Sequence, residues 1–221
     1  LRPRSETAEW QGIVMQVTAQ DKFWNDLYSK APPASSGKPG MALAQFASPL
    51  SPGEALELGC AKGDDAVWLA GRGFQVTAVD ISSVVLEYAA ENARRAGVTD
   101  RIRFEAHDLA MSFPEGAYDL VTASFLHSPH DWPRTRVLAR AASVVRPGGH
   151  LLIVEHGSYA PWSWSSNEAP PPAAEETFRA MALAADDWQR NCVCQIERMA
   201  TGPAGQTALV KDNIIFLRRI G

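Results

Sequence analysis

The stretch Glu54-Ala-Leu-Glu-Leu-Gly-Cys-Ala-Lys-Gly-Asp64, followed by Gln75-Val-Thr-Ala-Val-Asp80, decides the fold of this 221-residue chain. An apolar run ends in a turn of small residues, a helical segment follows, and a second apolar run ends in a carboxylate. Small residues at Gly59, Ala61 and Gly63 let the backbone approach a ligand at the carboxyl end of a parallel sheet. The order strand, turn, helix, strand predicts the first βαβ unit of such a sheet.

The charge pattern of this turn favours a nucleoside ligand that carries no phosphate. A dinucleotide fingerprint, Gly-x-Gly-x-x-Gly, holds a pyrophosphate at a helix N-terminus. Here the small residues run Gly-x-Ala-x-Gly, and Asp64 and Asp65 open the helix. Two carboxylates would repel a pyrophosphate, although they suit the positive end of the helix dipole. The carboxylate of Asp80 can accept hydrogen bonds from both cis hydroxyls of a ribose, and its alternative role is a helix N-cap.

These motifs resemble those of the class I S-adenosylmethionine-dependent methyltransferases, and later motifs extend the resemblance over residues 54–156 in the family's order. The family branch that is most similar is the small-molecule one, with the thiopurine and tellurite-resistance methyltransferases. Ala61 stands where the family usually has glycine, and we expect a negative φ there. The segments that carry the resemblance are Glu57–Gly63, Val79–Ser82, His107–Leu109, Tyr118–Ser124 and Arg146–Val154.

Strand and helix patterns alternate along the chain, which predicts an α/β fold with a doubly wound, mostly parallel sheet. The resemblance implies seven strands, with the last one antiparallel. We expect a helical lid or extension over residues 1–40 and one methyltransferase domain over 41–221. The expected strands are 56–58, 74–79, 101–106, 118–124, 150–155, 192–199 and 208–219. The expected helices are 65–72, 83–95, 174–184 and one that begins at Pro133 and stops before Pro147.

Composition is that of an ordinary globular protein, with 46% hydrophobic and 21% charged residues. A net charge of -4 argues against nucleic acid as a partner, because phosphate binding depends on Lys and Arg. The apolar runs are far shorter than the ~20 residues of a membrane span. Leu1–Thr7 also lacks the apolar core of a secretory signal. We therefore expect a cytoplasmic protein without a membrane partner. Cys60, Cys192 and Cys194 lack metal-ligand spacing, and we expect them to be reduced.

The resemblance implies S-adenosylmethionine as the cofactor and assigns roles to individual residues. Asp80 would bind the ribose. Asp108 would bind the adenine amino group, or would only begin a turn. Glu57 would bind the ammonium group, directly or through water. Trp24 and Tyr28 share one face of a helix, and either pack that helix on the sheet or cover the methionine end of the cofactor. The expected cofactor-binding residues are Trp24, Glu57, Gly59, Cys60, Ala61, Gly63, Asp80, Ile81, Asp108, Leu109, Ser124 and Phe125.

Methyl transfer needs an in-line approach and the exclusion of water, and it needs a base only if the acceptor arrives protonated. His127 follows the fourth strand at the ligand-binding edge of the sheet and is the candidate base, with a loop hydrogen bond as its alternative role. We expect no metal, because the histidines lack a carboxylate pattern. The expected pocket for a small-molecule acceptor is lined by Tyr28, His130, His156, Tyr159, Trp162 and Trp164, although the two tryptophans also suit packing against a domain edge or a partner subunit.

Two other functions compete with this interpretation. A nicotinamide-dependent oxidoreductase is disfavoured because no third glycine completes a pyrophosphate loop and no Tyr-x-x-x-Lys pair is present. The second alternative is a non-catalytic protein that binds an S-adenosyl ligand, and the one feature that indicates it is Ala61. The sequence leaves open the atom that is methylated and the oligomeric state.

Overall fold

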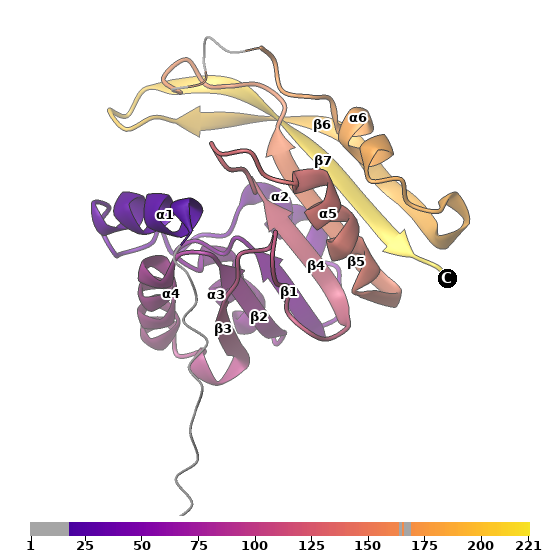
Figure 1. The fold of residues 1–221 in the computed structure, drawn as a ribbon, viewed down its shortest axis with the longest axis horizontal. Coiled ribbons are helices and arrows are strands. Elements are labelled where there is room, and N and C mark those ends of the chain that lie inside the picture. The colour runs from indigo at the N-terminus through magenta and orange to yellow at the C-terminus, as the bar shows by residue number, and fades with distance from the viewer. Residues whose placement is uncertain (1–17, 164, 166–168) are drawn as a thin grey trace, which may run out of the picture.

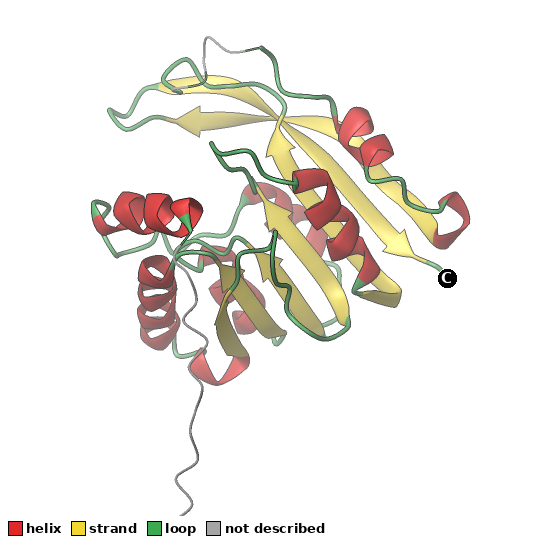
Figure 2. Ribbon diagram, viewed as in Figure 1, coloured by secondary structure: helices red, strands yellow, loops and turns green. Residues whose placement is uncertain are grey.

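The computed structural model describes residues 18–163, 165 and 169–221, and a seven-stranded sheet with helices on both faces organises them (Figures 1 and 2). The strand order is β3-β2-β1-β4-β5-β7-β6. β7 runs antiparallel to both of its neighbours, and the other neighbouring strands are parallel. The predicted fold is confirmed. The strands are β1 (Glu54–Leu58), β2 (Gln75–Asp80), β3 (Ile102–Ala106), β4 (Tyr118–Ser124), β5 (Val145–His156), β6 (Trp188–Thr201) and β7 (Thr207–Arg219).

The helices divide the core into two layers, one on each face of the sheet. On one face, Leu43 of α2 and Leu69 of α3 pack against Leu152 and Ile214. The opposite face holds a second cluster that includes Leu138 of α5. The helices are α1 (Ala19–Ser29), α2 (Met41–Ala47), α3 (Asp64–Gly71), α4 (Ser83–Ala96), α5 (Arg134–Ser143) and α6 (Ala174–Ala180), with 3-10 turns at Thr99–Arg101 and Ala185–Asp187.

Several element boundaries differ from the expected ones. β5 begins at Val145, because the strand continues through Pro147-Gly148-Gly149 as an irregularity, in which Gly148 has a φ of +85° and the pairing with β4 shifts register. β6 begins at Trp188, four residues before the predicted start at Cys192. The helix α2 was not predicted. Its seven residues are too few for a clear helical period.

The expectation that all three cysteines are reduced is wrong for two of them. Cys192 and Cys194 form a disulfide, whereas Cys60 is free and buried. Residues two apart on a strand face the same side. The pairing of β6 with β7 shifts register just before Cys192, and the Cα atoms of the two cysteines lie 5.7 Å apart, within the range that a disulfide spans.

We find no helix among the described residues that has both the length and the apolar character needed to cross a membrane.

Candidate active site

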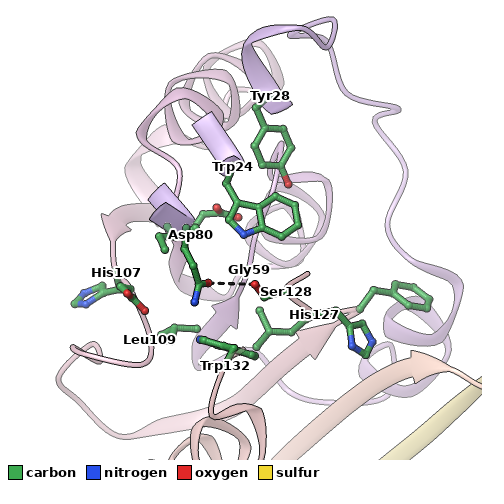
Figure 3. A pocket seen from close by; sticks show the side chains of 14 residues that line it. Trp24, Tyr28, Gly59, Asp80, His107, Leu109, His127, Ser128 and Trp132 are labelled. Carbon is green, nitrogen blue, oxygen red and sulfur yellow. Dashed lines mark hydrogen bonds between the residues drawn. The ribbon is translucent and has the colours of Figure 1, made fainter. Parts of the chain in front are cut away.

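A pocket opens where the carboxyl ends of β1, β2 and β4 meet α1 and the segment after β4 (Figure 3). Trp24 and Trp132 lie on opposite sides of this pocket, and His107 and His127 lie at its two ends. The lining residues are Gln20, Trp24, Tyr28, Gly59, Asp80, Ile81, His107, Asp108, Leu109, Phe125, Leu126, His127, Ser128 and Trp132. A second pocket shares Tyr28 and Gly59 with the first, and its other lining residues are Lys38, Gly40, Glu57, Cys60, Ala61, Lys62, Asp64, Asp65 and Ser124.

The turn between β1 and α3 is held by backbone hydrogen bonds. The N–H groups of Gly59 and Cys60 both donate to the Val79 carbonyl, at 2.8 and 2.9 Å. The expected negative φ at Ala61 is wrong, because its φ is +46°. The Ala61 N–H donates to Asp80 Oδ2 at 3.0 Å, and this bond offsets part of the cost of a left-handed alanine. Gly63 has a φ of +80° and begins α3 as its N-cap.

The carboxylate of Asp80 connects this turn to the start of α4. Its Oδ1 accepts from the Ser82 N–H at 3.0 Å, while Oδ2 holds Ala61. The N-cap of α4 is Ser82, whose hydroxyl oxygen accepts from the Val85 N–H, and not Asp80. Burial raises the pKa of Asp80, and the hydrogen bonds from Ser82 and Ala61 oppose this shift. Asp80 therefore lines the pocket from a fixed position.

Glu57 is a buried carboxylate with one free oxygen. Its side chain lines the second pocket, and Oε2 has no hydrogen-bond partner among the described residues. A backbone hydrogen bond from Ala66 holds the group, while burial, followed by the nearby charges of Asp65 and Asp80, raises its pKa well above the ordinary value. A buried carboxylate without a partner is costly. A cationic group bound in this pocket would supply the missing partner.

The two carboxylates that open α3 bind the segment that precedes α2. Asp64 accepts from the backbone N–H groups of Ser36 and Gly37, at 3.2 and 2.8 Å. Asp65 accepts from the Gly40 N–H at 2.6 Å and from the Ser124 hydroxyl at 3.4 Å. These carboxylates therefore fold residues 36–40 over the second pocket, a role that the sequence did not indicate.

The segments that follow β2 and β3 form the end of the first pocket at which His107 lies. Asp108 accepts from the Ala110 N–H at 2.9 Å, so the turn expected as its alternative role is present while its side chain also lines the pocket. Ile81 and Leu109 lie on the same lining. His107, which was not predicted, is held by Ser112 and Glu105 at 2.9 and 3.0 Å.

The helix α1 contributes residues to both pockets. The rings of Trp24 and Tyr28 stack with centroids 6.1 Å apart, as their spacing predicts, and both line the first pocket. Burial raises the pKa of Tyr28, so its hydroxyl stays protonated. Gln20 accepts a hydrogen bond from the Ser128 hydroxyl at 3.2 Å, which joins α1 to the segment after β4 (Figure 3).

His127 lies in an aromatic and charged environment. Its ring stacks on His156 with centroids 5.7 Å apart, and His156 in turn lies against Phe125 and Tyr159, at 4.6 and 5.8 Å. Burial, with the charges of Arg134 and His156, lowers the pKa of His127 to about 4. The imidazole is therefore neutral at pH 7 and can accept a proton or a hydrogen bond.

The remaining residues of the expected acceptor pocket are dispersed. His130 packs edge-on against Phe23 of α1, with ring centroids 5.3 Å apart. Trp162 packs at the turn between β6 and β7, 2.8 Å from the position that a Cβ on Gly202 would occupy. Trp164 lies outside the described residues. Neither His130 nor Trp162 lines the two pockets described above.

Sequence reasoning missed five lining residues of the first pocket. They come from α1 and from the segments after β3 and β4, and only His107 lies in one of the motifs, where the neighbouring Asp108 was the predicted ligand. The one available signal was position, because residues that follow parallel strands meet at the ligand-binding edge of the sheet. These residues are Gln20, His107, Leu126, Ser128 and Trp132.

Among the described residues, no group of three or more His, Cys, Asp or Glu side chains is arranged to hold a metal ion.

Comparison with known proteins places residues 55–149 in a family described as a methyltransferase domain. The 27-O-demethylrifamycin SV methyltransferase of Amycolatopsis mediterranei (strain S699) is 36% identical over 110 residues, which make up 48% of this chain and 39% of that protein. A tRNA 5-carboxymethoxyuridine methyltransferase of Escherichia coli (strain K12) is 34% identical over 110 residues, 47% of this chain and 40% of that protein. The chain thus spans less than half of either relative.

Solved structures resemble nearly the whole chain. A protein from a study of the conversion of a disulfide bond into a thioacetal group during echinomycin biosynthesis has a TM-score of 0.68 and 25% identity, and the match covers 90% of this chain and 92% of that one. TehB of Haemophilus influenzae has a TM-score of 0.60 and 19% identity, over 90% of this chain and 66% of that one. Residues 55–149 therefore belong to the methyltransferase-domain family, and the motif order and the sheet topology around them are those of the class I S-adenosylmethionine-dependent methyltransferases.

Proposed function

We propose that this protein transfers the methyl group of S-adenosylmethionine to a small-molecule acceptor. The observation that carries the proposal is the pair of buried carboxylates, Glu57 and Asp80, on either side of the small-residue turn Gly59–Gly63. One carboxylate has an oxygen without a partner and suits an ammonium group. The other lines the first pocket and suits two ribose hydroxyls.

The residues present fit this cofactor along the two joined pockets. Asp108, Leu109 and Ile81 would hold the adenine, and Asp80 the ribose. Glu57 would bind the ammonium group in the second pocket, with the side chain of Lys38 available on the same lining for the carboxylate. When bound, the cofactor supplies an electrophilic methyl group on a sulfonium. No phosphate site is needed, in agreement with the carboxylates at the start of α3.

The chain's own residues would orient the acceptor and exclude water. Phe125 and His127 line the pocket at the end opposite His107, where the methyl group would face the acceptor. His156 does not line the pocket but packs against both of these rings. The α1 helix, with Trp24 and Tyr28, would cover the cofactor. His127, neutral at pH 7, would take the proton of an acceptor that arrives protonated.

A small-molecule acceptor is favoured over a nucleic acid by charge. The net charge is -4, and the residues that line the first pocket include no Lys or Arg. A nucleic-acid substrate would require a basic surface along its backbone. By their names, the relatives from Amycolatopsis mediterranei and Escherichia coli methylate different acceptor classes, a small molecule and a tRNA, and both classes are therefore included in the test.

Calorimetry with S-adenosylmethionine, S-adenosylhomocysteine and NAD tests the cofactor. We expect binding of the two S-adenosyl ligands and none of NAD, and binding of NAD alone would contradict the proposal. A turnover screen over thiols, phenols, amines and inorganic anions, with tRNA as a further arm, then tests the acceptor. Formation of S-adenosylhomocysteine is the readout. Turnover of tRNA alone would overturn the small-molecule assignment.

A further inference from the structure

The segment after β4 is held by a side chain from another element. Arg134, the first residue of α5, donates from Nε to the Leu126 carbonyl at 2.9 Å. Its terminal nitrogen also bonds to the carboxylate of Glu155, near the end of β5. Glu155 is buried, with 3% of its surface exposed, and Arg134 is partly buried. A planar guanidinium can bind a carbonyl and a carboxylate in a fixed relative position, which an ammonium group cannot.

The carbonyl that Arg134 holds belongs to Leu126, which lines the first pocket between Gly59 and His127. The Leu126 side chain lies against the cofactor turn, which is the small-residue turn Gly59–Gly63. A Cβ on Gly59 would be only 2.7 Å from Leu126 Cδ1. The next residue is His127. The chain at this point is also bent, since Phe125 has a φ of +51° and donates its N–H to the Val154 carbonyl at 2.8 Å. The bend and the Arg134 contact therefore fix this segment from two sides.

We propose that Arg134, held by the buried Glu155, is a positioning residue that fixes Leu126 against the cofactor turn and presents His127 to the acceptor. The inference rests on the proposed function, because it assigns His127 to the acceptor side of that same site. Arg134 itself does not line either pocket. It acts through the backbone of Leu126.

The same placement has an electrostatic consequence. The titratable and charged groups around His127 are Arg134 from α5 and His156 from β5. His156 is in turn influenced by Asp212 of β7, Arg198 of β6 and Glu155. Of the two direct neighbours, Arg134 carries a permanent positive charge, which lowers the pKa of His127. Arg134 thus lowers the pKa of His127, in addition to the effect of burial, as well as holding the segment in place.

Two variants separate position from charge. Arg134→Lys keeps the charge but lacks the planar fork. The double variant Arg134→Gln with Glu155→Gln removes both charges together, so that no buried carboxylate loses its partner. Arg136→Gln is the matched control, because it removes one positive charge from the same helix at an exposed position. The melting temperature of each full-length variant is measured first, which shows that it folds.

The readouts need no knowledge of the acceptor. Calorimetry gives the dissociation constant for S-adenosylhomocysteine, and NMR titration gives the pKa of His127, with His127→Asn to assign its signal. We expect Arg134→Lys to raise the dissociation constant about threefold to tenfold, since Leu126 loses its anchor. We expect the pKa of His127 to rise by about one unit in the double variant and to change little in Arg134→Lys or in the control.

The outcomes distinguish this inference from the proposed function. If the unchanged protein does not bind S-adenosylhomocysteine, the proposed function fails. If it binds, but both variants match it in dissociation constant and in the pKa of His127, the positioning role of Arg134 is wrong and the proposed function stands. If the His127 pKa shifts as much in Arg136→Gln as in the double variant, the shift reflects only the net charge of the protein, and the inference is also wrong.

Discussion

The Ser82 hydroxyl donates to the side-chain oxygen of Asn25 at 2.7 Å, and this bond docks α1 onto the start of α4. The same hydroxyl oxygen accepts from the Val85 N–H as the N-cap of α4. The Val84 N–H adds a longer bond of 3.3 Å to Asn25. A single residue of α1 therefore ties the helix that carries Trp24 to the strand end that carries Asp80.

Asn25→Ala should loosen α1 and weaken cofactor binding. The buried Ser82 hydroxyl would lose its acceptor, which costs about 1–3 kcal/mol, and Trp24 and Tyr28 would no longer be held over the pocket. We expect a rise of roughly tenfold in the dissociation constant for S-adenosylhomocysteine, measured by calorimetry. Lys22→Ala, on the exposed side of the same helix, is the control. Equal affinities in both variants would mean that α1 does not cover the cofactor.

Asp80→Ala should weaken the binding of S-adenosylmethionine by about 1–3 kcal/mol, because the ribose hydroxyls would lose a charged acceptor. Part of the loss would come from the turn, since the Ala61 N–H also depends on this carboxylate. Calorimetry with the cofactor and with adenine alone separates the two contributions, because adenine does not contain the ribose. Asp100→Ala, at an exposed position after α4, should change nothing. An unchanged dissociation constant would remove Asp80 from the site.

Ala61→Gly should stabilise the protein by up to about 1 kcal/mol, because glycine adopts a φ of +46° without the strain of a β-carbon. Gly63→Ala is the opposite test. It adds a methyl group at a φ of +80°, 3.0 Å from the Ala89 Cβ, and should destabilise the protein. Urea denaturation measures both free energies of unfolding. A loss of stability in Ala61→Gly would show that the alanine methyl group packs favourably in this turn.

The parts of the fold that the sequence predicts well are those in which each strand carries its own signal. β4 has the expected bounds, Tyr118–Ser124, because it is apolar on both faces as a central parallel strand should be. α4 has a serine N-cap, buried positions at Val85, Ala89 and Ala93, and Gly97 at its end, so both of its boundaries can be read. The start of β5 could not be predicted, because Pro147-Gly148-Gly149 is typical of a turn.

The residues of the candidate site also fall into two groups, those that the sequence predicts and those that only the structure shows. Asp80, Glu57 and Asp108 lie in motifs beside the strands that position them, and sequence spacing is enough to find them. The hydrogen bonds from Ser128 to Gln20 and from Arg134 to Leu126 join residues without any motif, and only the folded chain shows these pairs. The sequence also does not show the positive φ of Ala61, because the cost of a left-handed alanine is partly offset by a hydrogen bond from its N–H to the carboxylate of Asp80, 19 residues away.

Stability should depend on His127 at acidic pH. The pKa of His127 is about 4 in the folded protein and 6.5 as its ordinary value, so between these values the unfolded chain binds a proton that the folded chain does not. The free energy of unfolding therefore falls as the pH decreases from 6.5 towards 4. His127→Gln should remove this contribution. Urea denaturation at several pH values would show a difference between the two proteins that changes through this window, and a constant difference would contradict the low pKa.

The effect of His127→Gln on turnover should distinguish acceptor types. If the acceptor is a hydroxyl whose proton leaves during transfer, turnover should fall by ~100-fold or more, because base catalysis typically contributes that much. If the acceptor is a thiolate or another ionised nucleophile, the change should cost little, since approach and orientation supply most of the acceleration. The dissociation constant for S-adenosylmethionine and the melting temperature are measured alongside turnover.

His130→Gln is the matched control for this variant. His130 lies three residues further along the same segment, packs on Phe23 and does not line the pocket, so its replacement should leave turnover within about twofold. A His127→Gln protein that keeps its cofactor affinity and still methylates a phenol at the full rate at pH 7 would exclude His127 as the base. His156 would then take the proton directly, because its ring lies against both His127 and Phe125. In that case, His156→Gln should reproduce the loss that His127→Gln failed to cause.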